Sequence, residues 1–209
     1  MSAKSSPTAE KPADAAVIAR VVAAARQHFF AHGVRSVTMD DLARELGMSK
    51  KTLYACFPSK EALLQAVIDD KFQGMKSELE KIAAADQASF PEALQRLLAC
   101  LQSQAAEIQP AMIRDLRLVN PEVFKRVETL RAQLIQQHFG RIFAQGQQAG
   151  MIRTDISAAL MVQILLAAVQ AIMNPAGISA LNLTPQAGIS AIVSVVLNGV
   201  VVQARSSGQ

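Results

Sequence analysis

Residues 33–61 constrain the fold more than any other part of the chain, because residues that start and end helices follow one another there at short intervals. Thr38 precedes an apolar helical pattern, and Asp41 three positions later completes an approximate capping box. Gly47 comes directly after that pattern, where a residue in the left-handed conformation ends a helix at no steric cost. Ser49 is placed to cap a second short helix. The spacing therefore predicts two short helices joined by a tight turn.

The second of these helices has an apolar and a polar face. Leu53 and Phe57 stand four positions apart and are expected to point inward. Hydroxyl and ammonium groups gather on the other side: Lys50, Lys51, Thr52 and Tyr54. Such groups bind phosphate oxygens, and lysines release counterions from DNA. A solvated surface on an ordinary helix pair is the alternative, but the full string of caps favours a DNA-reading helix-turn-helix.

This region resembles the N-terminal DNA-binding domain of the TetR family of bacterial transcriptional regulators. The resemblance spans residues 17–64 and is carried by three stretches: 18–33, 38–54 and 57–64. It implies an all-helical homodimer that binds a palindromic DNA operator and releases it when a small molecule enters the C-terminal domain. Two departures concern base reading: Lys51 stands where the family often has Gly, and Ala55 and Cys56 replace a second aromatic residue and His. The operator sequence therefore does not follow from the resemblance.

The resemblance also implies which residues touch DNA. By position, four match the family's contacts to the DNA backbone: Thr38, Thr52, Tyr54 and Lys60. Three match the start of its recognition helix: Ser49, Lys50 and Lys51. With Arg44, a further cation of the same segment, these residues make up the predicted DNA-binding set.

The net charge of +4 is concentrated in the same segment. Residues 15–60 hold seven basic and three acidic side chains, whereas residues 1–14 hold two of each and residues 61–209 hold twelve of each. The whole positive excess therefore lies where DNA contact is predicted, which favours nucleic acid as the partner.

The remaining chemistry points away from an enzyme. The sequence lacks the nucleophile elbow, the P-loop, the dinucleotide glycine motif and zinc signatures. His28 and His32 have metal-ligand spacing but lack a third ligand, so we expect no metal and no cofactor. Cys56 and Cys100 are too few for a disulfide framework, which favours a cytoplasmic location. We expect inert packing for them, with redox sensing as the alternative.

We expect an all-α chain of about nine helices, divided into three parts. Residues 1–14 are rich in Ser, Pro, Ala and Lys and are interpreted as a disordered tail without a secretory signal. Residues 15–64 form the helix-turn-helix domain, and residues 65–209 form a helical effector-binding and dimerisation domain. The expected helices outside the helix-turn-helix cover 15–32, 59–84, 90–106, 111–118, 121–148, 156–173 and 185–203.

Residues 156–204 contain no charged side chain. The two helical runs in this segment approach the ~20 residues that span a bilayer, so a membrane hairpin is one interpretation. Gln163 and Gln170 lie on one helical face, which is instead typical of an amphipathic helix. A dimer interface explains the loss of charge better. We place it at four residues: Ala167, Ala171, Ala191 and Val195.

The middle and later helices carry large, flexible apolar side chains, as adaptable binding surfaces do. We place an effector pocket at five of them: Met112, Leu116, Phe139, Met161 and Leu165. The candidate polar anchors are Arg114, Asp115, Arg117 and His138. An ordinary helical core is the alternative for each residue. An apolar pocket of this kind fits a small hydrophobic effector. Together with the resemblance, this predicts a ligand-responsive regulator, most simply a repressor.

Overall fold

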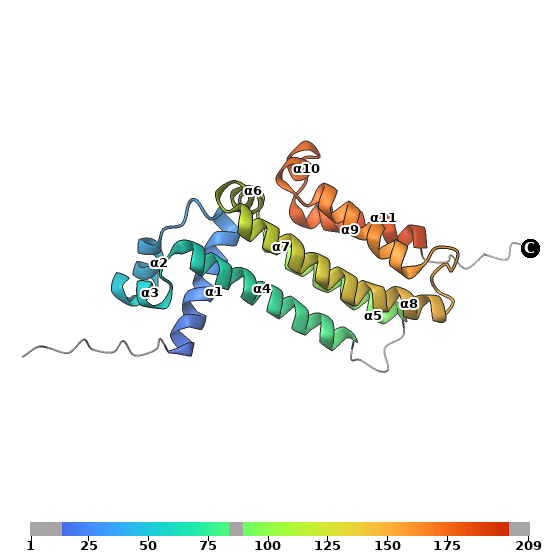
Figure 1. The fold of residues 1–209 in the computed structure, drawn as a ribbon, viewed down its shortest axis with the longest axis horizontal. Helices are drawn as coiled ribbons and strands as arrows, with labels where there is room; N and C mark the ends of the chain where they lie inside the picture. The colour runs from blue at the N-terminus through green and yellow to red at the C-terminus, as the bar shows by residue number, and fades with distance from the viewer. Residues whose placement is uncertain (1–13, 84–89, 201–209) are drawn as a thin grey trace, which may run out of the picture.

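The computed structural model describes residues 14–83 and 90–200, and every regular element in those ranges is helical (Figure 1). The elements are α1 (Ala15–His32), α2 (Met39–Glu45), α3 (Lys50–Cys56), α4 (Lys60–Ala83), α5 (Phe90–Ala106), α6 (Pro110–Val119), α7 (Pro121–Leu134), η1 (Ile135–Phe139), α8 (Gly140–Gln148), α9 (Ala158–Ile172), α10 (Pro175–Ala180) and α11 (Pro185–Val200). The predicted all-α class is confirmed. The predicted tail, apart from Asp14, lies outside the described residues.

The helices begin where the capping residues predict. Four side chains each accept a hydrogen bond at 3.0–3.1 Å from the backbone N–H three residues further on: Thr38, Ser49, Ser59 and Asn120. These bonds satisfy N–H groups that have no partner inside the helix. Gly47 has φ +64°, as a residue that ends a helix in the left-handed conformation should. Local hydrogen bonding therefore explains the short helices.

The helix count differs from the prediction at α10, which lies in the segment expected to be a connection. Asn174 accepts a hydrogen bond from the Gly177 N–H at 3.0 Å, and Pro175 occupies the first helical turn. The Asn-Pro pair therefore starts a short helix instead of only ending the preceding one. If α7, η1 and α8 are counted as one continuous helix, the described residues form ten helices.

The wide turn of η1 lies inside this continuous helix. Apolar or buried pairs recur there every four residues: Leu134 and Ile135, His138 and Phe139, Ile142 and Phe143. A spacing of four drifts around an ordinary α-helix, and a π-type turn compensates for that drift. All six side chains therefore face the interior.

Two hydrophobic cores lie along the molecule. The first packs α1, α2, α3 and the start of α4 against Met112, Leu116 and Val123. The second packs the far half of α4 with α5, η1, α8, α9 and α11. Phe72 of α4 packs against both cores, so α4 connects them. The domain boundary between residues 64 and 65 stays a prediction, because the first core continues beyond it.

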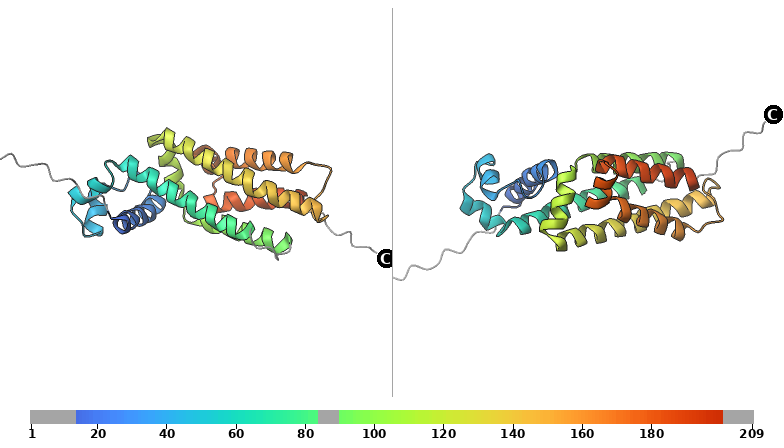
Figure 2. Two further views of the ribbon diagram at one scale, coloured as in Figure 1. Left: turned by 60° about the horizontal axis from the view of Figure 1, so that its bottom comes forward. Right: turned by 90° about the horizontal axis from the view of Figure 1, so that it is seen from above.

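The three views place the helix-turn-helix at one end of an elongated bundle (Figures 1 and 2). In Figure 1, α9 and α11 form the upper layer, α7 and α8 the middle, and α4 the lower side of the bundle. No helix in the described ranges has both the length and the apolar character to cross a bilayer. The membrane hairpin that the charge-free segment suggested is therefore not favoured.

Candidate nucleic-acid interface and adjoining cavity

The turn between α2 and α3 is held by hydrogen bonds on both sides. The Met48 N–H donates to the Ala43 carbonyl oxygen at 3.0 Å, which closes the turn around Gly47. From α1, the Arg20 guanidinium donates to the Leu46 carbonyl oxygen at 3.2 Å and so satisfies the end of α2. These bonds fix the direction in which α3 leaves the turn.

One face of α3 is buried and the other is open to solvent. Leu53 is fully buried and Phe57 nearly so. The α3 outer face consists of the exposed residues Lys50, Lys51, Thr52, Tyr54 and Ala55. Tyr54 leaves 46% of its surface exposed, so its hydroxyl is accessible to a partner. The structure thus presents the polar side of α3 as the sequence predicted.

The predicted DNA-binding residues lie together on α2, α3 and the start of α4. Seven of the eight are exposed, and Lys60 is half-buried. The Lys60 ammonium donates to the Val37 carbonyl oxygen at 2.7 Å and ties the start of α4 to the segment before α2. In the free protein Lys60 therefore has a structural partner, and its contact with DNA stays a prediction.

Acidic side chains already neutralise part of the cationic surface. The Lys50 ammonium lies 2.5 Å from an Asp40 carboxylate oxygen, and the Arg44 guanidinium lies 3.0 Å from Asp41. The Thr38 hydroxyl donates to Asp41 at 2.6 Å, and this bond together with Arg44 lowers the pKa of Asp41. Lys51 forms no hydrogen bond or ion pair with any residue that the structure describes. It is therefore the most available cation on the α3 outer face.

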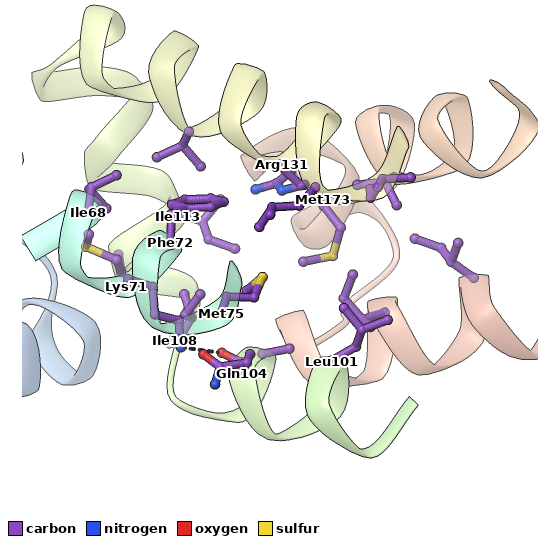
Figure 3. Close-up of a pocket in the computed structure, with 18 of the residues that line it drawn as sticks. Ile68, Lys71, Phe72, Met75, Leu101, Gln104, Ile108, Ile113, Arg131 and Met173 are labelled. Atoms are coloured by element: carbon purple, nitrogen blue, oxygen red, sulfur yellow. Dashed lines mark hydrogen bonds between the residues drawn. The ribbon is translucent and has the colours of Figure 1, made fainter. Parts of the chain in front are cut away.

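A cavity of about 150 Å³ lies inside the helical bundle that follows the helix-turn-helix, and Phe30 of α1 also borders it. Helices α4, α5, α6, α7, α9 and α11 all contribute to its lining, which is mostly apolar (Figure 3). Four of the five predicted pocket residues border it: Met112, Leu116, Phe139 and Leu165. Met161 is buried in the second core but does not border the cavity.

The polar residues of the lining are not those that the sequence suggested. Arg114 and Arg117 are exposed, and Asp115 and His138 are buried away from the cavity. The three polar residues that line the cavity are Lys71, Gln104 and Arg131. A recognisable signal existed for Lys71, because it follows Val67 and Ile68 at core spacing on an otherwise apolar stripe.

The Lys71 side chain is buried, and its ammonium group has hydrogen-bond partners within the protein. Its ammonium donates to Glu107 at 2.9 Å and to the Gln104 carbonyl oxygen at 3.0 Å, and it lies 5.5 Å from the Phe30 ring centre. Burial lowers the pKa of Lys71, and Glu107 opposes that change. Burial also disfavours the charge of Glu107, but hydrogen bonds from Arg26 and Lys71 outweigh it and lower the pKa of Glu107. Arg26, Lys71 and Glu107 therefore form one ion-pair cluster beside the cavity.

Helix α6 joins the cavity to the helix-turn-helix. Met112 and Leu116 border the cavity, whereas Asp115 on another side of α6 accepts the Arg35 N–H at 2.9 Å. Asp115 is 1% exposed. Gly33 packs so closely that a Cβ there would lie 2.5 Å from the same carboxylate. The helix that borders the cavity is therefore hydrogen-bonded to the segment that leads into α2.

The proposed dimer residues lie on the outer surface of α9 and α11. Ala167, Ala171, Ala191 and Val195 are all exposed, and Val195 leaves 74% of its surface open. Leu160 and Ile164 extend the α9 part of this apolar surface. We call these six residues the α9–α11 face.

Neither the cysteines nor the histidine pair forms an obvious reactive centre. Cys56 and Cys100 are free and half-buried, and burial raises the pKa of Cys100, which favours the unreactive thiol. His28 lies 2.6 Å from Glu45, an ion-pair distance between α1 and the end of α2. Across the described ranges, no group of three or more His, Cys, Asp or Glu side chains is arranged to hold a metal ion.

In comparisons with known proteins, this chain is similar to bacterial transcriptional regulators. A family model described as "Bacterial regulatory proteins, tetR family" matches residues 21–67. The HTH-type transcriptional regulator UidR of Escherichia coli (strain K12) is 29% identical over 149 residues, which cover 70% of this chain and 74% of UidR. The uncharacterized HTH-type transcriptional regulator YvaF of Bacillus subtilis (strain 168) is 24% identical over 168 residues, which cover 79% of this chain and 86% of YvaF.

A solved structure supports the same fold along most of the chain. The complex of SmeT with triclosan superimposes with a TM-score of 0.63 at 18% identity, covering 90% of this chain and 93% of SmeT. SmeT is described as the repressor of the multidrug efflux pump SmeDEF of Stenotrophomonas maltophilia. The similarity therefore extends through the part of the bundle that contains the cavity.

Proposed function

Since the chain belongs to the TetR family of bacterial regulatory proteins, we propose that it represses transcription by binding a palindromic operator as a homodimer. It is a DNA-binding, ligand-responsive transcriptional regulator, and we propose that a small apolar effector in the cavity releases it from DNA. The proposal rests on the two contacts that α6 makes. Its Met112 and Leu116 side chains border the cavity, and its Asp115 carboxylate accepts a hydrogen bond from the Arg35 N–H. This function needs no enzymatic step, and we propose a cytoplasmic location because the operator DNA lies there.

The predicted contacts suit a phosphate backbone flanking a major groove. The α3 outer face supplies hydroxyl and ammonium donors, and the N-terminus of α3 adds backbone N–H groups. The hydroxyls of Ser49 and Thr52 lie 2.8 Å apart at that N-terminus, so both are oriented before DNA arrives. We assign base reading to the start of α3, at Lys50 and Lys51. The residues to which we assign phosphate contacts are Thr38, Arg44, Thr52, Tyr54 and Lys60.

A second copy of the chain is the partner that fits the α9–α11 face. Charged residues are absent from both helices, and α9 and α11 pack against each other along their inner sides. Two copies paired through this face are related by a two-fold axis, which places two helix-turn-helix units on one side of DNA. Their half-sites are then expected about 34 Å apart, one turn of the duplex.

The effector acts by favouring one of two arrangements of the dimer. A ligand that fills the cavity pushes against the α6 side chains that border it, and α6 carries the Asp115 contact to the DNA-binding end. If the ligand binds more tightly to an arrangement whose α3 helices do not match the operator, it lowers DNA affinity by that difference. SmeT is described as a repressor and has been solved with triclosan, which supports a repressor released by an apolar molecule.

Selection of genomic DNA tests this function directly. The purified full-length chain is mixed with sheared genomic DNA of its bacterium at physiological salt, the bound fragments are sequenced, and the strongest is footprinted. We expect one protected palindrome whose half-sites are one turn apart. Lys51→Ala should weaken binding to it, whereas Lys81→Ala, at an exposed site on the far end of α4, should not. Binding without a preferred site would contradict the proposal.

A further inference from the structure

The cavity lining contains an arginine whose charge is not paired. Arg131 of α7 is half-buried, and in Figure 3 its side chain extends from α7 into the region enclosed by Phe72 and Met173. Among the described residues, no hydrogen bond or ion pair involves its guanidinium. Glu128, one turn earlier on the same helix, interacts with it electrostatically but lies beyond ion-pair distance. Five N–H donors thus remain available at the wall of an apolar cavity.

Placing the Arg131 guanidinium beside apolar groups, without a paired anion, is unfavourable in free energy. Burial lowers the pKa of Arg131, since the surrounding apolar groups solvate its charge poorly. Buried arginines are normally paired with carboxylates or phosphates, because the guanidinium fork binds two oxygens at once. An anion that entered the cavity would supply the missing partner.

The second cation of the lining does not compete for that role. Lys71 already donates to Glu107 and to the Gln104 carbonyl oxygen, and Glu107 is shared with Arg26. The lining has one more polar atom without a partner, the side-chain oxygen of Gln104. The polar groups of the cavity are therefore not all satisfied by the described residues, and Arg131 is the charged one among them without a hydrogen-bonded or ion-paired partner.

The size of the cavity limits what the anion can be. A volume of about 150 Å³ corresponds to an apolar cavity that accepts a benzene ring. The lining beyond Arg131 is dominated by aliphatic, methionine and phenylalanine side chains, which favour an uncharged, apolar body. Helix α6 is part of the same lining, so the occupant contacts the element that holds the Arg35 N–H.

We propose that the effector is a small organic acid with one carboxylate, which Arg131 binds, and an apolar body that fills the remaining cavity. This inference rests on the proposed function for its regulatory consequence, but the carboxylate site itself is independent of DNA binding. A site with Arg131 at its wall should bind acids more tightly than neutral molecules of the same shape. The apolar lining alone would not produce that preference.

Matched pairs of probes test the site by calorimetry on the full-length dimer. Benzoate is compared with benzamide, and octanoate with octanamide, so that each pair differs only in the charge of its head group. We expect the acids to bind roughly 10- to 100-fold more tightly than the amides, as a hydrogen-bonded charge pair contributes. Equal affinity within each pair, or no binding of either acid, would overturn the proposal.

Two substitutions locate the preference at Arg131. Arg131→Met removes the charge and keeps an apolar side chain, so the acids should lose their advantage while the affinity of the amides stays the same. Arg126→Met is the matched control, because Arg126 is an exposed arginine of α7 that pairs with Asp69 outside the cavity. Arg131→Lys should retain part of the preference. An unchanged preference in a folded Arg131→Met protein would refute the assignment.

A parallel DNA measurement separates this inference from the proposed function. If Arg131 binds the acids but no operator is found, the carboxylate site stands and the regulatory proposal fails. If the protein binds a palindrome and neutral probes bind as well as acids, the regulatory proposal stands and this inference fails.

Discussion

Replacing Gly33 with alanine tests the contact between the helix-turn-helix and α6. Gly33 has φ 83° and ψ 162°, a backbone conformation that is essentially restricted to glycine. A Cβ there would lie 2.5 Å from the Oδ2 atom of Asp115, which accepts the Arg35 N–H at 2.9 Å. Because Asp115 is 1% exposed, its carboxylate has no solvent to move into.

Two costs add in the Gly33→Ala protein. The backbone conformation costs a residue with a Cβ about 1–3 kcal/mol. Displacing the carboxylate leaves the Arg35 N–H without its acceptor, which costs a further 1–3 kcal/mol or so. We therefore expect the free energy of unfolding, measured by urea denaturation, to fall by about 2–6 kcal/mol, more than a typical single substitution costs.

A double-mutant cycle separates the two costs. In an Asp115→Ala background the carboxylate is absent, so Gly33→Ala should cost only its backbone strain of about 1–3 kcal/mol. The difference between the two backgrounds measures the collision with Asp115. If Gly33→Ala costs the same in both, the carboxylate is not the obstacle and our account of the contact is wrong.

Two other glycines serve as controls. Gly47 has φ +64°, but no atom lies within 4 Å of the position that a Cβ would take, so Gly47→Ala should cost only about 1–2 kcal/mol. Gly74 lies inside α4 with open space around it, so Gly74→Ala should stabilise the protein by about 0.5–1 kcal/mol. A Gly33→Ala protein no less stable than the Gly47→Ala protein would also refute the reasoning.

Three further predictions concern DNA binding, assembly and pH. Tyr54→Phe should weaken operator binding up to about tenfold by removing one phosphate hydrogen bond, with the dimer intact in light scattering; unchanged DNA affinity would remove Tyr54 from the interface. Val195→Glu should yield monomers in light scattering, because it buries an unpaired charge in the α9–α11 face; a dimeric variant would show that the interface lies elsewhere. Folding lowers the pKa of Glu107, so the stability it contributes is present above its ordinary value of 4.5 and is lost as the pH falls through the folded value. Glu107→Gln should therefore flatten the acid limb of stability in urea titrations against pH, and parallel acid limbs would contradict this.

The sequence predicts the parts of this fold that local hydrogen bonds determine. Thr38, Ser49, Ser59 and Asn120 cap helices where their side chains and spacing indicate, because a capping bond involves only three or four consecutive residues. The same locality explains the failure at α10. An Asn-Pro pair ends one helix and starts another equally well, and only packing against neighbouring helices decides whether the second one forms.

The candidate site was predicted in part, for a related reason. The polar residues of α3 are exposed because Leu53 and Phe57 fix the helix by its apolar side, which periodicity reveals. The polar residues of the cavity lining were not predicted, because Arg131 reaches the cavity only through the placement of α7 against α4. Likewise, no local pattern indicates that the Lys60 ammonium binds the Val37 carbonyl oxygen.

The Lys50–Asp40 and Arg44–Asp41 pairs have a consequence for how the protein responds to ionic strength. A free cation on a DNA-binding surface displaces one counterion when it meets a phosphate, and each such exchange steepens the decline of affinity with salt. A cation that already holds a carboxylate exchanges one anionic partner for another and releases less. The salt dependence of operator affinity should thus be shallower than the number of basic residues at the interface suggests. A bacterium whose internal salt rises under osmotic stress would then keep more of this regulator on its promoter.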